Sequence, residues 1–235
     1  MALIWVYIDQ FQGEPLPASW EALAVARKLG DQVHALVLGQ KVSGIAEEAG
    51  KYGADVAHVA DDASLVDFRP ESYADVISKL AAVGQPDVIL FPTNSRSREL
   101  AGMLSVDLKA GLLVDVIELD MAGDKLVATR PIYAGKLLSK VETATKPAMA
   151  TLRARAFGKP EHDAGRSTEI KPVDASMLGG DYATSGFEYS AADGAVSLGD
   201  AAVIVSGGRG TSNNANLEAP ADISDEKEQE IWRAQ

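Results

Sequence analysis

The feature that most constrains this chain is the regular alternation, over its first hundred or so residues, of short apolar runs with longer amphipathic segments. The apolar runs have the length of buried strands, and the segments after them have helical periodicity with Pro, Ser and Gly near their ends. The strands are expected at 2–8, 33–39, 55–60 and 87–93, and the helices at 15–29, 43–52, 71–83 and 96–109. Strands separated by helices run parallel, with helices on both faces of the sheet. The prediction is a doubly wound, Rossmann-like α/β domain.

The pattern changes after Lys109, where strand-like runs follow one another without a helix-length segment between them. These runs are 112–120, 126–132, 137–143 and 148–154, with turn residues at 121–125 and 133–136. Consecutive strands that are joined by short turns pair antiparallel. We therefore expect antiparallel hairpins at the edge or end of a mostly parallel sheet.

Three regions are expected along the chain. Residues 1–157 form the α/β domain, and residues 158–200, which lack periodicity and are rich in Gly, Ser, Asp and Pro, form an extended linker. The apolar run 201–205 is predicted to be a buried strand that ends in the sequence Ser-Gly-Gly-Arg-Gly. Residues 201–235 are thus expected to begin a second α/β domain without completing it, and their acidic end is expected to face solvent.

Composition excludes several classes of function. The 34 acidic and 22 basic residues give a net charge of −12, whereas nucleic acid and anionic membranes bind basic surfaces. The chain has no cysteine, which removes thiol catalysis and cysteine-ligated metals. Its histidines, His34, His58 and His162, are far apart, so no metal site is predicted, and the first two fall in strand patterns that favour structural roles. No apolar run approaches the ~20 residues of a membrane span, so we expect a cytoplasmic protein without membrane insertion.

The glycine turn at residues 206–210 is the most suggestive local motif. Glycines at the carboxyl end of a strand allow backbone N–H groups to approach an anion, and an adjacent arginine can pair with phosphate. The candidate binding residues are Gly208, Arg209 and Gly210. The motif is neither a GxGxxG fingerprint nor a P-loop, and the alternative is an ordinary glycine turn with a solvated arginine.

Two further groups of residues suggest anion binding. In the segment 93–99, Asn94 or Ser95 can cap a helix while Arg96 and Arg98 hold an anion at its positive end, although caps and solvated charges explain the same residues. In the strand-rich region, Arg153 and Arg155 are two residues apart and are expected on one face of a strand.

Together with Arg130, this second group can clamp an anionic cofactor or partner carboxylates, or simply line an exposed hairpin. No Ser/His/Asp grouping or pair of carboxylates emerges. The sequence pattern therefore predicts no catalytic residue.

Longer segments in a fixed order carry a family resemblance. They are LIWVYID (3–9), ARKLGDQVHALVLG (26–39), KYGADVAHVADD (51–62), PDVILFPTNSRSRELAGMLSVDLKAGLLVDVIEL (86–119), LVATRPIYAGKLLSKVETATKPAMATLRARAF (126–157) and VIVSGGRG (203–210). In this order they resemble the electron-transfer flavoprotein alpha subunit.

The resemblance implies an electron carrier rather than a self-contained enzyme. It implies a heterodimer with a beta subunit that holds AMP or a second FAD, and an FAD that takes electrons from acyl-CoA or other dehydrogenases, as in fatty acid β-oxidation, to a quinone reductase or other acceptor. The N-terminal domain is then a docking platform. Arg209 is the FAD contact that the family pattern implies, and Gly208 and Gly210 flank it.

The chain departs from the family after Gly210. A Ser-Arg segment, a Gly-Gln-Thr-Gly segment and a Ser-Gly-x-x-x-His segment of the family's FAD domain are absent, so we expect this chain alone not to hold FAD tightly. A shortened chain, a split gene and a mobile domain that a structure leaves unseen are three open explanations. Two other functions stay open, namely a flavin-free scaffold and a stand-alone adenine-nucleotide-binding domain.

Overall fold

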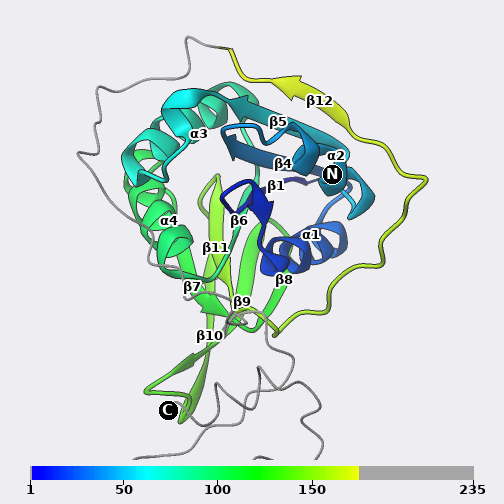
Figure 1. The fold of residues 1–235 in the computed structure, drawn as a ribbon. Coiled ribbons are helices and arrows are strands. Elements are labelled where there is room, and N and C mark those ends of the chain that lie inside the picture. Colours follow the sequence, from blue (N-terminus) through cyan, green and yellow to red (C-terminus); the bar gives the residue numbers. More distant parts are fainter. Residues whose placement is uncertain (1, 175–235) are drawn as a thin grey trace, which may run out of the picture. The chain divides into compact units, whose positions relative to one another are not determined.

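The predicted strand–helix alternation forms a seven-stranded sheet in the computed structural model, which describes residues 2–174 (Figure 1). The strand order is β12-β5-β4-β1-β6-β11-β7. The strands are β1 (Leu3–Ile8), β4 (Gln32–Gly39), β5 (Val56–Asp61), β6 (Val88–Pro92), β7 (Leu112–Val116), β11 (Ala148–Leu152) and β12 (Glu169–Pro172). All of their pairings are parallel. This arrangement confirms the predicted doubly wound α/β class.

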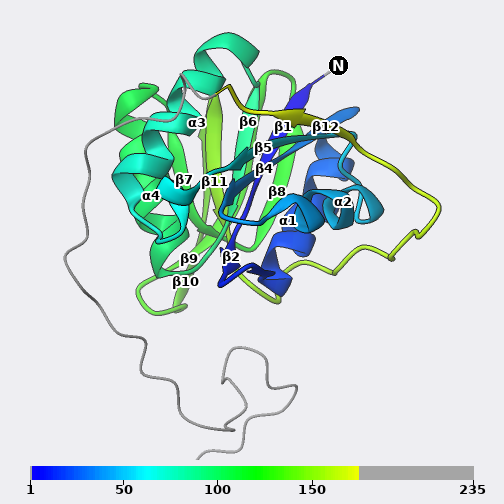
Figure 2. The ribbon, with the colours of Figure 1, turned by 45° about the horizontal axis from the view of Figure 1, so that its top comes forward.

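Four helices cover the two faces of this sheet (Figure 2). They are α1 (Pro17–Leu29), α2 (Ser43–Lys51), α3 (Pro70–Gly84) and α4 (Ser95–Asp107), and a short 3₁₀ helix, η1 (Ala63–Leu65), precedes α3. The helices α1 and α2 pack on one face, and α3 and α4 pack on the other. None of the helices within residues 2–174 is long and apolar enough to cross a membrane.

Strand β1 lies at the centre because its side chains are apolar on both faces. Ile4, Val6 and Ile8 point into the core beneath α1 and α2, whereas Trp5 and Tyr7 point into the core beneath α3 and α4. All five side chains are at most 1% exposed. A strand buried on both faces needs hydrogen-bonded neighbours on both sides, which β4 and β6 provide.

The expectation that every strand after residue 112 pairs antiparallel is wrong for β7 and β11. Strand β11 lies between β6 and β7 and pairs parallel with both. Its five residues are all buried, so it needs two strand neighbours that an edge position does not provide. After the hairpins the chain therefore returns to an interior position of the sheet, next to the edge strand β7.

The remaining strands form the predicted antiparallel hairpins as a separate sheet. Strand β9 (Lys125–Ile132) pairs with β8 (Glu118–Ala122) on one side and β10 (Leu137–Thr143) on the other. The apolar run expected at 112–120 is thus divided at Ile117 between β7 and β8. A further small hairpin, β2 (Gln10–Phe11) with β3 (Glu14–Pro15), follows β1.

The described part of the expected linker lies against the domain and contributes the edge strand β12. The Arg166 guanidinium is 2.6 Å from the Asp55 carboxylate, and the Asp163 backbone N–H donates to the Lys51 carbonyl at 3.0 Å. All four residues of β12 are exposed, so this strand has no apolar pattern from which the sequence could predict it. The boundaries proposed near residues 157 and 200 stay predictions.

We expect Gly84→Ala to destabilise the domain by about 1–3 kcal/mol, because the tightly packed core resists an added methyl group. A Cβ at Gly84, the last residue of α3, would overlap the ring of Trp5, which is 1% exposed. Urea denaturation measures the change.

The matched control is Gly102→Ala within α4, where a Cβ meets no atom within 4 Å. This change should stabilise the protein by about 0.5–1 kcal/mol, because alanine loses less backbone entropy in a helix. Equal stability of the two variants would contradict the packing argument.

Candidate functional site

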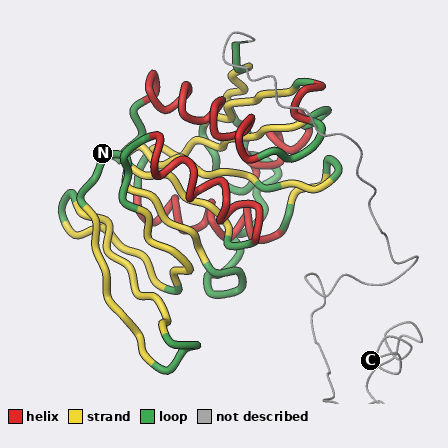
Figure 3. The backbone as a smooth tube through the Cα atoms, turned by 90° about the vertical axis from the view of Figure 1, so that its left-hand side faces the viewer, coloured by secondary structure: helices red, strands yellow, loops and turns green. Residues whose placement is uncertain are grey.

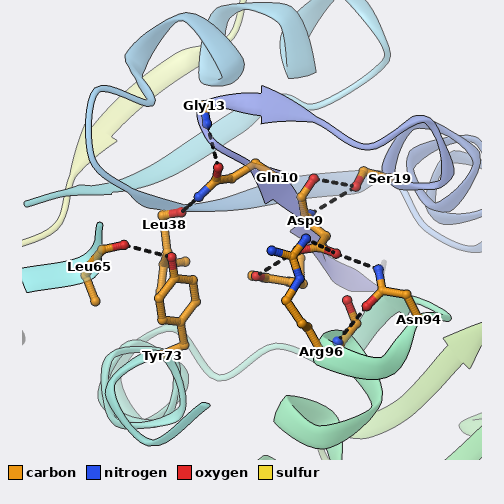
Figure 4. Close-up of polar contacts among 11 residues, drawn as sticks. Asp9, Gln10, Gly13, Ser19, Leu38, Leu65, Tyr73, Asn94 and Arg96 are labelled. Atoms are coloured by element: carbon orange, nitrogen blue, oxygen red, sulfur yellow. Dashed lines mark hydrogen bonds and ion pairs between the residues drawn. The ribbon is translucent and has the colours of Figure 1, made fainter. Parts of the chain in front are cut away.

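The centre of the sheet contains the position where ligands usually bind in this class of fold. From β1 the chain continues to β4 on one side, and it later crosses back to β6 on the other. Open α/β sheets bind ligands at the carboxyl ends of strands where the order reverses in this way. Asp9 follows β1, and Asn94 and Arg96 follow β6, so these three residues meet at this switch point (Figure 4).

Asp9 is the centre of a dense network of polar contacts. Its side chain is 1% exposed and accepts a hydrogen bond from the Asn94 amide at 2.5 Å, while the Arg96 guanidinium lies 3.3 Å away. The Tyr7 hydroxyl donates to the same carboxylate at 3.4 Å. The Asp9 backbone N–H donates to the Ser19 hydroxyl oxygen at 3.0 Å, which connects the network to α1.

Arg96 is held by aromatic rings as well as by its counter-ion. Its guanidinium carbon lies 5.5 Å from the Phe11 ring centre and 5.7 Å from that of Phe68, within cation–π range. Burial raises the pKa of the Asp9 carboxyl, and the Arg96 charge and the Asn94 hydrogen bond oppose that rise. Arg96 therefore neutralises an internal carboxylate.

The helix-cap explanation of residues 93–99 is confirmed. The Asn94 side chain accepts a hydrogen bond from the Ser97 backbone N–H at 2.9 Å and caps α4. Asp9, Asn94 and Arg96 therefore pair with one another at the switch point. Sequence reasoning missed Asp9, although a lone carboxylate at the end of an apolar strand was a usable signal.

We expect Arg96→Met to destabilise the protein by about 3 kcal/mol at pH 8, because it leaves the buried Asp9 carboxylate without its cation. The folded-state pKa of Asp9 lies above its ordinary value and rises further in this variant. Asp9 therefore binds more protons in the folded state than in the unfolded state. For this reason the loss of stability that Arg96→Met causes becomes smaller as the pH falls toward 5. Urea denaturation at both pH values measures it.

Arg98→Met is the control, since Arg98 is an exposed residue of the same helix. Its effect should stay within about 0.5 kcal/mol. An Arg96→Met deficit that is the same at pH 5 and pH 8 would show that lost packing, not charge, causes it.

The predicted pairing of Arg153 and Arg155 on one strand face is wrong, because β11 ends at Leu152 and both residues lie in the following turn. Arg153 donates to the Asp115 carboxylate through Nε at 3.0 Å and Nη2 at 2.5 Å. The Arg155 backbone N–H donates to Glu21 of α1 at 2.9 Å. The two arginines therefore have different partners.

Arg130 lies in β9 and is half-buried. Its Nε atom is buried and has no hydrogen-bond partner among the described residues. The guanidinium is near enough to Asp115 to help lower the pKa of that carboxyl, after the larger effect of the Arg153 hydrogen bond. Sequence reasoning missed Asp115, the acidic residue that pairs with Arg153.

The histidines occupy structural positions. His34 Nδ1 lies 3.1 Å from His58 Nε2, and both rings pack near Trp5. Burial, and then the neighbouring His34, lower the pKa of His58 to about 4, and burial also lowers the pKa of His34, so burial disfavours a charge on either ring. His162 contacts the edge of the Tyr52 ring. Residues 2–174 contain no cluster of three or more side chains suited to a metal ion.

The antiparallel sheet β8-β9-β10, which we call the arm, carries three large exposed apolar side chains near its tip. Its β9–β10 hairpin extends beyond the helices (Figure 3). Tyr133, Leu137 and Leu138 at that tip are 75%, 55% and 65% exposed. Grouped apolar side chains at a protein surface often mark an interaction site. The arm is therefore a candidate docking surface.

One face of the arm also forms a shallow groove of about 530 Å³. The charged residues that line it are Glu118, Asp120, Lys140 and Glu142. The groove is acidic on balance, and Leu119 and Met121 are among its apolar lining residues. The arm thus offers an apolar tip beside an acidic groove.

The predicted flavin residues Gly208, Arg209 and Gly210 lie outside the described residues and stay a prediction. The comparison with known families concerns the domain itself. The model of the electron transfer flavoprotein domain matches residues 4–178, which include all the strands and helices described above except the first residue of β1. The chain belongs to the electron transfer flavoprotein family. The resemblance noted from the ordered segments is confirmed.

Curated relatives in this family include alpha subunits and FixB proteins. The chain is 32% identical to the electron transfer flavoprotein subunit alpha of Syntrophomonas wolfei, with 96% of this chain and 71% of the relative covered. It is 35% identical to the protein FixB of Azotobacter vinelandii, with coverages of 94% and 65%. The alpha subunit of Bacillus subtilis is 30% identical, with coverages of 91% and 66%. The chain thus spans about two thirds of the length of these relatives.

Proposed function

We propose that this chain serves as an alpha-type subunit of an electron transfer flavoprotein. Such a protein is a heterodimeric, FAD-dependent electron carrier that takes electrons from dehydrogenases, such as an acyl-CoA dehydrogenase of fatty acid β-oxidation, and passes them to a quinone reductase or other acceptor. The observation that carries the proposal is the family match over residues 4–178, together with relatives that are named alpha subunits. The carrier works in the cytoplasm in this proposal.

In this proposal the described domain is a docking platform and not the flavin pocket. Asp9, Asn94 and Arg96 fill the switch point with an internal ion pair and its hydrogen bonds, so the usual nucleotide position is occupied by the chain itself. This observation also disfavours a stand-alone adenine-nucleotide-binding domain at that position. The flavin is then assigned to residues beyond the described domain.

Arg209, with Gly208 and Gly210, is our candidate for FAD contact. The three residues follow an apolar run that is predicted to be a strand, where backbone N–H groups and a guanidinium suit phosphate oxygens or a reduced flavin's negative charge. When bound, FAD supplies the redox chemistry. The partner beta subunit holds AMP or a second FAD in this proposal.

The arm is the surface on which we place the partner beta subunit. In the β9–β10 hairpin, Leu138 pairs with Pro131 and Leu137 with Ile132, so each face of the hairpin carries one apolar cross-strand pair near the tip. Burying such side chains against a partner removes apolar area from water, at about 25 cal/mol per Å². The two strands fix the positions of the contact residues, which reduces the entropy lost on binding.

We expect Leu138→Asp to weaken association of the complete subunit with its beta partner by about tenfold or more, because a central apolar contact becomes an unpaired charge. Analytical ultracentrifugation or calorimetry of the purified pair measures the affinity. The control is Val106→Asp on α4, where the side chain is 75% exposed but lies off the arm. Unchanged affinity for Leu138→Asp would remove the arm from the interface.

We expect Arg209→Ala to lower the flavin content of the complete heterodimer, while Arg209→Lys keeps part of it because the positive charge remains. The flavin absorbance per heterodimer measures this. A flavin content and electron transfer rate that do not change in Arg209→Ala would favour the flavin-free scaffold instead.

A further inference from the structure

A second cluster of charges lies at the carboxyl ends of β7 and β11, away from the Asp9 network. Asp115 in β7 has a φ of +60°, and the pairing of β7 with β11 shifts register there. The Asp115 backbone N–H donates to the hydroxyl of Thr151, a fully buried side chain, at 2.8 Å. Backbone strain and bulges of this kind occur where a side chain must be directed to a particular position.

The strained backbone directs the Asp115 carboxylate at Arg153. Two hydrogen bonds, from Arg153 Nε and Nη2, fix the plane of the guanidinium. The Arg153 backbone N–H also donates to the Val116 carbonyl at 2.9 Å, which fixes the main chain at Arg153. Asp115 neutralises Arg153, and the Nη1 group of Arg153 makes no hydrogen bond within the described part of the chain.

Two more arginines lie on elements beside this pair, because the Ile117 backbone N–H donates to the Thr129 carbonyl of β9 at 2.9 Å and α4 packs against β7. The charges of Arg98, in the first turn of α4, and Arg130, in β9, both act on Asp115. Across residues 2–174, no carboxylate forms an ion pair with either guanidinium. Arg130 is half-buried with its Nε atom unpartnered, and a partly desolvated cation in that state is costly unless an anion joins it.

We propose that Arg98, Arg130 and the oriented Arg153 form a binding site for a phosphate group, as a monoester or a diphosphate of a small ligand. Charge balance favours phosphate over carboxylate. After Asp115 has neutralised Arg153, the two remaining arginines carry two positive charges, and a phosphate monoester carries about −1.5 to −2 at pH 7. Planar guanidinium groups also match phosphate oxygens with paired hydrogen bonds. Arg130 belongs to strand β9 of the arm, whereas Arg98 lies in α4 and Arg153 follows β11.

Calorimetric titration of the full chain with inorganic phosphate, at constant ionic strength, tests the proposal. We expect saturable binding that Arg130→Gln weakens about tenfold, since a charge-assisted hydrogen bond to the phosphate is lost. Arg130→Lys, which keeps the charge, should weaken binding less. Circular dichroism verifies that each variant is folded.

The matched control is Arg27→Gln, which removes a guanidinium at the other end of the strands. Its partner Asp55 retains Arg166, and phosphate affinity should stay within about twofold. Absence of saturable binding to the unaltered chain, or equal affinity in Arg130→Gln, would overturn the proposal. Glutarate that binds as tightly as phosphate and depends equally on Arg130 would also overturn it, in favour of a carboxylate-bearing partner.

Discussion

The buried carboxylate of Asp9 is the interaction on which the centre of this domain depends. It joins the end of β1 to the cap of α4 through Asn94 and to the first turn of that helix through Arg96. The backbone of the same residue bonds to Ser19 in α1. A charge that is 1% exposed persists only with such partners, so the elements around it must keep their relative positions.

The polar side chains at the carboxyl ends of the strands are arranged differently at two positions of the sheet. At the switch point, side chains of the domain pair with one another and occupy the space that a nucleotide takes in many related folds. Beside β7 and β11, one carboxylate faces three arginines, and two of these have no ion pair among the described residues. The charges at the switch point therefore neutralise one another, whereas the cluster beside β7 and β11 keeps a net positive charge.

Much of the fold followed from local patterns. The alternation in residues 2–109 predicted four strands and four helices, because parallel strands covered on both faces are apolar throughout and their helices have one apolar side. Asn94 was recognisable as a cap from its position before a helix. The exposed strand β12 and the position of β11 were not recognisable, because hydrogen bonds to distant strands decide them.

The sequence by itself determined the class of fold, the acidic surface and the family, since these depend on periodicity, on composition and on ordered segments. Only the tertiary structure decided what each charged side chain does. Arg96 and Arg98 are two residues apart, yet one pairs with a buried aspartate and the other is exposed. Arg153 and Arg155 also differ, because β11 ends before them. The partner of a charge is set by strands that meet from distant parts of the chain, which local sequence does not encode.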